Sequence, residues 1–163
     1  MMQVFSKISE TEALSPIIIK NNGNTYLTLY DVMDTDSLLH DNKKHILCFP
    51  SLGELKYFCE KNGLHMENEI WAEYDFDKPI ENPIDFRHIL DHWNLLNTIA
   101  KDFGMYFEGD RKKYNALYDL LFRLNTPIEP IPPTYTVSKK HFKYLLKIFR
   151  KKNRFLNHFE LYQ

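Results

Sequence analysis

Two histidines of this chain have the type and spacing that chemistry can use. His88 and His92 lie four residues apart in "HILDH", so on a helix they would share one face. Two imidazoles in that arrangement can share a zinc ion or transfer protons. The stretch lacks the Glu that follows the first His of a metalloprotease helix, and no third ligand or nucleophile motif accompanies the pair. We therefore expect no bound metal, no cofactor and no catalytic residue, which means a protein that is not an enzyme.

Carboxylates gather in two further stretches, "DVMDTD" (31–36) and "EIWAEYDFD" (69–77). The first lacks the Gly and the terminal Glu of a calcium-binding EF-hand loop. In the second, a strand would turn Glu73, Asp75 and Asp77 to the same side, where their repulsion is destabilising. Three interpretations remain: a solvated face, a surface that meets a basic partner, or a Mg²⁺ site. As candidate partner-binding residues we take Asp31, Asp34, Asp36, Glu69, Glu73, Asp75 and Asp77.

The acids would be positioned by short strands. Asn22-Gly23 separates two β-rich runs and predicts a hairpin with strands near 16–20 and 25–31. A third strand is predicted near 45–50, and alternating polarity predicts a fourth over 69–77. Between the last two, Ser51 and Glu54 form a capping box for a helix that runs to about Lys61.

The histidines would be carried by the central helix of the protein, predicted over 83–103. Asn82 is suited to its N-cap and Gly104 to its end. At about 100° per residue most of its circumference is apolar, which is typical of a core element rather than a surface helix. The residues that we expect in the core are Phe86, Trp93, Leu96 and Phe103.

Further helices are predicted near 111–124 and from Ser138 onward, the latter with Phe142, Leu145, Leu146 and Phe149 inward. The basic segment 137–163 holds eight Lys or Arg and one acid, whereas the rest of the chain is net acidic. Its mixture of cations and aromatics is typical of nucleic-acid contact, and equally of an amphipathic helix packed on the body. We expect the second arrangement and no direct nucleic-acid binding.

The 163 residues predict one domain, 1–163, with 137–163 as a basic C-terminal helical segment. The fold class is predicted to be α+β: a small, mainly antiparallel sheet packed against several helices. The sequence has no run of 18 apolar residues and no visible secretory signal, so we expect no membrane contact. Cys48 and Cys59 lie in apolar patterns, as reduced thiols of a cytoplasmic protein would.

Over residues 44–133 the chain resembles the immunity proteins of contact-dependent growth inhibition and related polymorphic toxin systems. The resemblance rests on "LDHWNLL" (90–96), "YDLLF" (118–122) and the proline-rich "NTPIEPIPP" (125–133). The preceding β-α-β pattern, "HILCFPSLGELKYF" followed by "IWAEYDFD", is similar as well.

This resemblance implies a small bacterial, cytoplasmic protein without catalysis that binds and neutralises one cognate toxin domain. The toxin domain is often a nuclease, an RNase or tRNase in particular, whose active site or substrate surface the immunity protein covers. An acidic body fits independently, because a nuclease presents a basic cleft to phosphates. The alternative is a nucleic-acid-binding accessory protein that uses the basic C-terminal helix.

Overall fold

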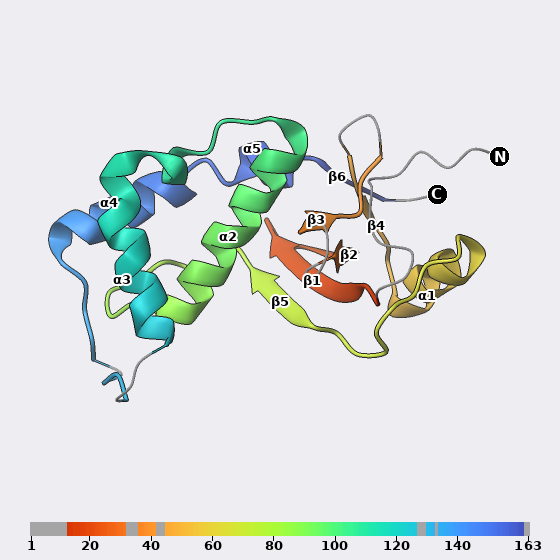
Figure 1. The fold of residues 1–163 in the computed structure, drawn as a ribbon, viewed down its shortest axis with the longest axis horizontal. Coiled ribbons are helices and arrows are strands. Elements are labelled where there is room, and N and C mark those ends of the chain that lie inside the picture. The colour runs from red at the N-terminus through yellow and green to blue at the C-terminus, as the bar shows by residue number, and fades with distance from the viewer. Residues whose placement is uncertain (1–12, 32–35, 42–44, 127–129, 133, 162–163) are drawn as a thin grey trace. The chain divides into compact units, whose positions relative to one another are not determined.

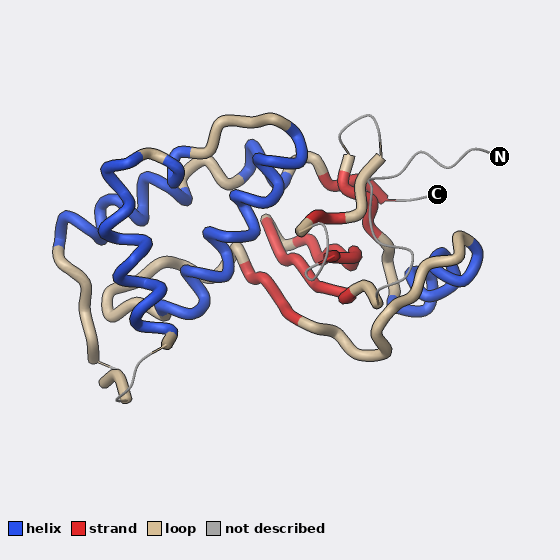
Figure 2. Tube along the Cα trace, viewed as in Figure 1, coloured by secondary structure: helices blue, strands red, loops and turns tan. Residues whose placement is uncertain are grey.

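Strands and long helices occupy different stretches of the chain (Figures 1 and 2). The structure, a computed structural model, describes residues 13–31, 36–41, 45–126, 130–132 and 134–161. It divides into two compact units: unit 1 is Met1–Asp77 with Leu156–Gln163, and unit 2 is Lys78–Phe155. The predicted α+β class with a mainly antiparallel sheet is confirmed. The expectation of one domain stays a prediction, and we describe each unit by itself.

Unit 1 is built on a four-stranded sheet in the order β3-β2-β1-β5. β1 (Ser15–Asn21) and β2 (Asn24–Asp31) form the predicted hairpin, and its turn residues Asn22 and Gly23 have φ values of 53° and 78°. Positive φ at both positions is what a tight two-residue hairpin requires. β3 (Ser37–Leu38) extends the sheet beside β2, and β5 (Ala72–Asp75) pairs with β1 in parallel.

A second, two-stranded sheet joins β4 (Ile46–Cys48) to β6 (Phe159–Leu161) in parallel. The sequence predicts a helical segment over 137–163, and this is wrong for residues 159–161. The ring of Phe159 stacks on Tyr26 at 5.0 Å between centroids, and the backbone of 159–161 pairs with β4. Tertiary pairing therefore overrides the local helical pattern at this end of the chain.

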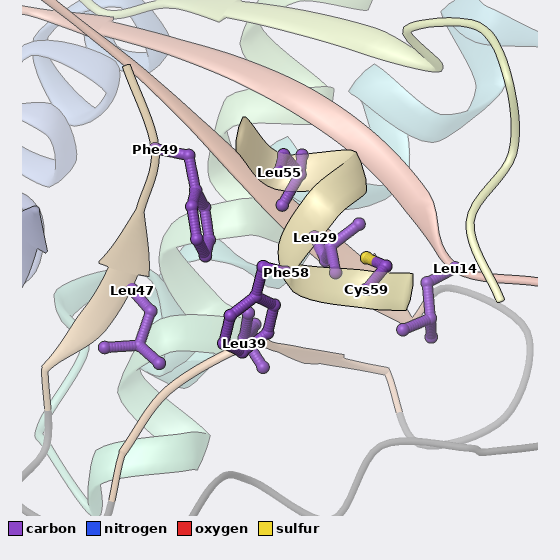
Figure 3. Close-up of a cluster of buried hydrophobic side chains, with 8 residues drawn as sticks. All are labelled: Leu14, Leu29, Leu39, Leu47, Phe49, Leu55, Phe58 and Cys59. Carbon is purple, nitrogen blue, oxygen red and sulfur yellow. The ribbon is translucent and has the colours of Figure 1, made fainter. Parts of the chain in front are cut away.

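The core of unit 1 lies between the sheet and α1 (Leu52–Lys61). Ser51 caps this helix as predicted, because its hydroxyl accepts a hydrogen bond from the Glu54 amide at 3.2 Å. Figure 3 shows the side chains of α1 meeting those of the strands and connecting segments. The buried cluster consists of Leu14, Leu29, Leu39, Leu47, Phe49, Leu55, Phe58 and Cys59.

Unit 2 is helical, with α2 (Phe86–Phe103) as its longest element. Two 3₁₀ turns, η1 (Glu108–Asp110) and η2 (Lys112–Tyr114), lead into α3 (Asn115–Asn125). α4 (Lys139–Phe149) follows, and the short α5 (Asn153–Leu156) spans the point in the sequence where unit 2 ends. No helix in the described part of the chain combines the length and apolar composition that a membrane crossing requires.

The start of α2 differs from the prediction, whereas its end does not. Asp85, rather than Asn82, is the N-cap, and its carboxylate accepts a hydrogen bond from the His88 amide at 3.2 Å. Asn82 instead binds the backbone of Val137 through two hydrogen bonds of 3.0 and 3.1 Å. Gly104 ends the helix in the left-handed conformation, with φ 63°.

Candidate protein-binding site

Strand β5 and the residues just before it present an apolar and acidic surface. Tyr74 and Phe76 are buried as the alternating pattern predicts, whereas Ile70, which the same pattern places on the inner side, is exposed. Trp71 is 53% exposed and Ile70 is 36% exposed, flanked by the exposed acids Glu69 and Glu73. We call residues Glu69, Ile70, Trp71 and Glu73 the β5 rim.

The acids of β5 are compensated within the protein, which explains why the strand tolerates them. Glu73 forms an ion pair with Lys20 on the neighbouring strand, with 2.7 Å between Nζ and Oε1. The hydrogen bond to Glu73, followed by the charge of this carboxylate, raises the pKa of Lys20. Asp75 accepts a hydrogen bond from the Asp77 amide at 3.0 Å. These contacts remove the bare repulsion expected from the sequence.

Asp77 anchors the β1–β2 hairpin. Its two carboxylate oxygens accept hydrogen bonds from the amides of Asn22 at 2.6 Å and Gly23 at 2.9 Å. Both amides belong to the turn, where no strand partner is available to them. Asp77 therefore has a structural role, because it holds the hairpin turn in place.

The predicted acids of the first stretch do not form one surface. Asp31 is only 2% exposed at the end of β2, so it cannot present its carboxylate to a partner, and this part of the prediction is wrong. Asp34 lies outside the described residues. Asp36 is exposed, with φ 50°, and accepts a hydrogen bond from the Tyr30 hydroxyl at 2.6 Å. Strand β3 begins beside it, which the sequence did not predict.

Glu69 differs from these acids because it forms no hydrogen bond or ion pair with another described residue. Next to it, the ring of Trp71 is supported on one side by Tyr30, edge to face at 6.2 Å between centroids. The β5 rim thus combines an uncompensated carboxylate with a large indole that is held in place yet exposed. Such a combination is suited to contact with another macromolecule.

The helix that carries the histidines is mostly core. Trp93, Leu96 and Phe103 are buried as predicted, whereas Phe86, the first residue of α2, is only half-buried. His92 is buried as well, and its Nδ1 lies 2.6 Å from the backbone oxygen of His88. The two imidazole rings lie 3.7 Å apart between centroids and are tilted by 30° to each other. Among the described residues no third metal-binding side chain joins them.

A hollow of about 330 Å³ in unit 2 is a feature that the sequence reasoning missed. Three elements line it: α2, η1 and α3. The Asn97 amide nitrogen, when turned toward Asp110, lies 3.2 Å from both carboxylate oxygens. The lining combines polar side chains with two aromatic rings, and it consists of Trp93, Asn97, Gly109, Asp110, Asn115, Tyr118 and Asp119.

Two exposed carboxylates make this hollow suited to a cation. Asp110 and Asp119 stand at its edge, and the Tyr118 hydroxyl is engaged with Asn94 at 2.9 Å. An ammonium or guanidinium group would find hydrogen-bond acceptors in these carboxylates. The signal in the sequence was faint, since Asn97 lies on a helix interpreted as core and the acids lie on separate segments.

Cations gather around two tyrosines elsewhere in unit 2. Lys113 Nζ lies 5.0 Å from the ring centre of Tyr114 and 5.7 Å from that of Tyr144, and Lys140 lies 5.7 Å from the latter. Desolvation, followed by the charges of Arg111 and Lys147, lowers the pKa of Lys113. On α4 itself, Leu145, Ile148 and Phe149 face inward, and Leu146 is 46% exposed, contrary to the predicted inner face.

Comparison with known proteins supplies a fold but no family. No protein-family profile matches the chain, and no curated protein is significantly similar to it. Among solved structures, the C-terminal domain of SatS in complex with bromine is similar, with a TM-score of 0.58 and 15% sequence identity. The similarity covers 92% of this chain and 94% of that domain. The chain therefore has the fold of the SatS C-terminal domain.

Proposed function

We propose that this protein is an immunity protein that binds and neutralises a cognate secreted toxin domain, and that the β5 rim supplies part of the contact. The observation that carries the proposal is Trp71, which is 53% exposed while flanked by the carboxylates of Glu69 and Glu73. The resemblance of residues 44–133 to immunity proteins supports the same class of function.

The chemistry of the rim favours a basic protein partner. A tryptophan that becomes buried on binding is among the side chains that contribute most to an interface. Carboxylates beside it speed association with a positively charged surface and disfavour partners of like charge. Glu69 has no compensating cation among the described residues. Of the acids of the rim, it is therefore the one whose pairing with a cation of the partner would add most to binding.

A nuclease domain is the partner that this chemistry suits best. Its substrate-binding surface must be basic to hold phosphates, and an acidic, aromatic rim can occupy that surface. Inhibition would require only steric cover and charge complementarity, with no catalytic residue, metal or cofactor taking part. We place this encounter in the cytoplasm, where an incoming nuclease would meet its nucleic-acid substrate.

The test uses the toxin domain encoded in the neighbouring reading frame. We expect Trp71→Ala and Glu69→Gln each to weaken binding at least ten-fold, about 1.4 kcal/mol, in calorimetric titrations. The matched control is Tyr57→Ala, because Tyr57 is 66% exposed on α1 of the same unit. Melting temperatures of all three variants should stay near that of the parent. Parental affinity in both rim variants would contradict the assignment of the rim.

Nucleic-acid binding is the second candidate, and Lys113 and Lys140 beside the ring of Tyr144 favour it, with Lys147 close to Lys113. Cations beside accessible aromatic rings are typical of surfaces that bind single-stranded nucleic acid. If this function is right, the protein alone should bind a fluorescent RNA oligonucleotide. The affinity should fall steeply with salt and fall further in Lys140→Ala. Absence of RNA binding at low salt would remove this candidate.

A further inference from the structure

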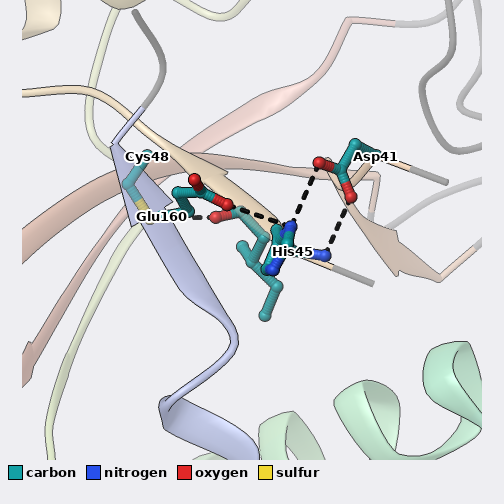
Figure 4. A network of polar contacts seen from close by, with 5 residues as sticks. Asp41, His45, Cys48 and Glu160 are labelled. Carbon is teal, nitrogen blue, oxygen red and sulfur yellow. Dashed lines mark hydrogen bonds and ion pairs between the residues drawn. The ribbon is translucent and has the colours of Figure 1, made fainter. Parts of the chain in front are cut away.

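Two carboxylates of unit 1 converge on one imidazole nitrogen. His45 Nδ1 lies 2.9 Å from Glu160 Oε2 and 3.4 Å from Asp41 Oδ2. The ligand atoms of all three residues lie within 4.8 Å of one another. Figure 4 shows the two carboxylates approaching the imidazole from different sides, one from β6 and one from the segment before β4.

The backbone holds these residues in place. The Asp41 amide donates to the His45 carbonyl at 3.0 Å, and the His45 amide donates to Asp41 Oδ1 at 2.9 Å. This pair of hydrogen bonds ties the two residues directly to each other. Glu160 is brought to the same place by the parallel pairing of Leu47 with Glu160. The convergence is therefore a product of the fold and not of one flexible side chain.

A shared proton does not account for both contacts. An imidazole Nδ1 carries at most one hydrogen, which it can donate well to a single acceptor. A hydrogen bond joins this nitrogen to Asp41 Oδ2 at 3.4 Å, so Glu160 Oε2 meets the same nitrogen at 2.9 Å without a second hydrogen. A divalent cation at the centre would bond the nitrogen and both carboxylates together, and its charge would balance the two carboxylates.

The spacing fits such a cation. Nitrogen and oxygen ligands lie about 2.0–2.2 Å from Zn²⁺, so neighbouring ligand atoms are about 3.0–3.6 Å apart. The separations of 2.9 and 3.4 Å are close to this range. The two carboxylates would have to approach each other, and both can, because the side chains of Asp41 and Glu160 are 23% and 57% exposed.

We propose that Asp41, His45 and Glu160 form a binding site for a divalent transition-metal ion of the Zn²⁺ class. Imidazole nitrogen is a ligand that suits zinc and its neighbours, whereas Mg²⁺ and Ca²⁺ take oxygen ligands. Three protein ligands leave coordination positions for water. The bound ion would tie Asp41 and His45 to strand β6 and so hold this strand on the rest of unit 1.

The experiment titrates ZnCl₂ into the full chain, prepared without an affinity tag and dialysed against EDTA. We expect one ion per chain, and at least ten-fold weaker binding in His45→Ala, His45→Gln and Glu160→Gln. His65→Ala is the matched control, because His65 is an exposed histidine of the same unit. Circular dichroism checks that each variant is folded. Two different substitutions at position 45 ensure that a folding defect of one of them does not decide the result.

Two further measurements separate this site from adventitious binding. Zn²⁺ should slow amide exchange in 159–161 of the parent and leave that of Glu160→Gln unchanged, because the metal holds β6 only through this carboxylate. MgCl₂ at the same concentration should give no comparable effect, since the imidazole is a required ligand. Binding that survives in both position-45 variants, equal binding of Mg²⁺, or the lack of any Zn²⁺ binding would each overturn the proposal.

Discussion

A Cβ atom added at Gly109 would lie 2.9 Å from Nε1 of Trp93 and 2.6 Å from the ring of Phe107. Both rings are buried, so neither can withdraw easily. We expect Gly109→Ala to destabilise the protein by about 1–3 kcal/mol, as overpacking does, in urea-induced unfolding. Gly53→Ala is the control, and we expect it to raise the unfolding free energy. Gly53 lies within α1, and only Ser51 Oγ is near the added Cβ atom, at 3.9 Å. Equal stability of the two variants would contradict this packing.

The two tryptophans should respond to truncation in opposite ways. Trp93 is 2% exposed and packs edge to face on Tyr118 at 5.4 Å between centroids, whereas Trp71 is 53% exposed. We expect Trp93→Ala to cost about 3–5 kcal/mol of unfolding free energy. Trp71→Ala should change it by about 0.5 kcal/mol or less. Thermal melts of the two variants check this, and an unchanged melting temperature in Trp93→Ala would contradict the core role of Trp93.

The hydrogen bond between Glu108 and Tyr114 should make the unfolding free energy depend on pH in the acidic range. The Tyr114 hydroxyl donates to Glu108 Oε2 at 2.5 Å, and this contact is the main reason that the pKa of Glu108 is lowered. A carboxylate with a lowered pKa contributes stability above its unfolded value, about 4.3, and loses it as pH falls through the folded value. In Glu108→Gln we therefore expect a smaller loss of stability between about pH 6 and pH 3.

This comparison needs denaturant midpoints of the parent and the variant at both ends of that range. Asp119→Asn is the matched control, because Asp119 is an exposed carboxylate of the same unit at the edge of the hollow. It should keep the acid dependence of the parent. An identical acid dependence in Glu108→Gln and the parent would refute the linkage.

Both cysteines should be slow to react in the folded protein. Burial, followed by the charge of Glu60, raises the pKa of Cys59 to about 11, and burial raises the pKa of Cys48 further. At about pH 8 the reactive thiolate is then a small fraction, and access is blocked as well. We expect little reaction with a disulfide reagent in buffer and reaction of both thiols in urea. A fast reaction in buffer would show that one thiol is exposed.

Elements defined by local signals were predicted well from the sequence. Asn22-Gly23 marked the hairpin, Ser51 the start of α1, and Gly104 the end of α2, because each acts through hydrogen bonds or φ angles within a few residues. The buried Trp93 followed from helical spacing in the same way. Such signals do not depend on where the rest of the chain lies.

Features made by distant segments could not be predicted. Strand β6 and the parallel pairing of β1 with β5 join residues far apart in sequence, and periodicity carries no information about such partners. Asp77 looked like one acid of a surface because its contact with the Asn22–Gly23 turn is 54 or 55 residues away. The hollow near Trp93 was missed for the same reason, since three elements supply its lining.

The pairing of Ile46 with Phe159 has a consequence for how the chain emerges from the ribosome. Unit 2 is inserted between the two segments of unit 1, so residues 78–155 are synthesised before β6 can reach β4. Unit 2 is free to fold during translation, while the edge of β4 must wait, unpaired, for its partner. Until then the exposed edge is open to pairing with another chain, which makes a nascent-chain chaperone most useful in this interval.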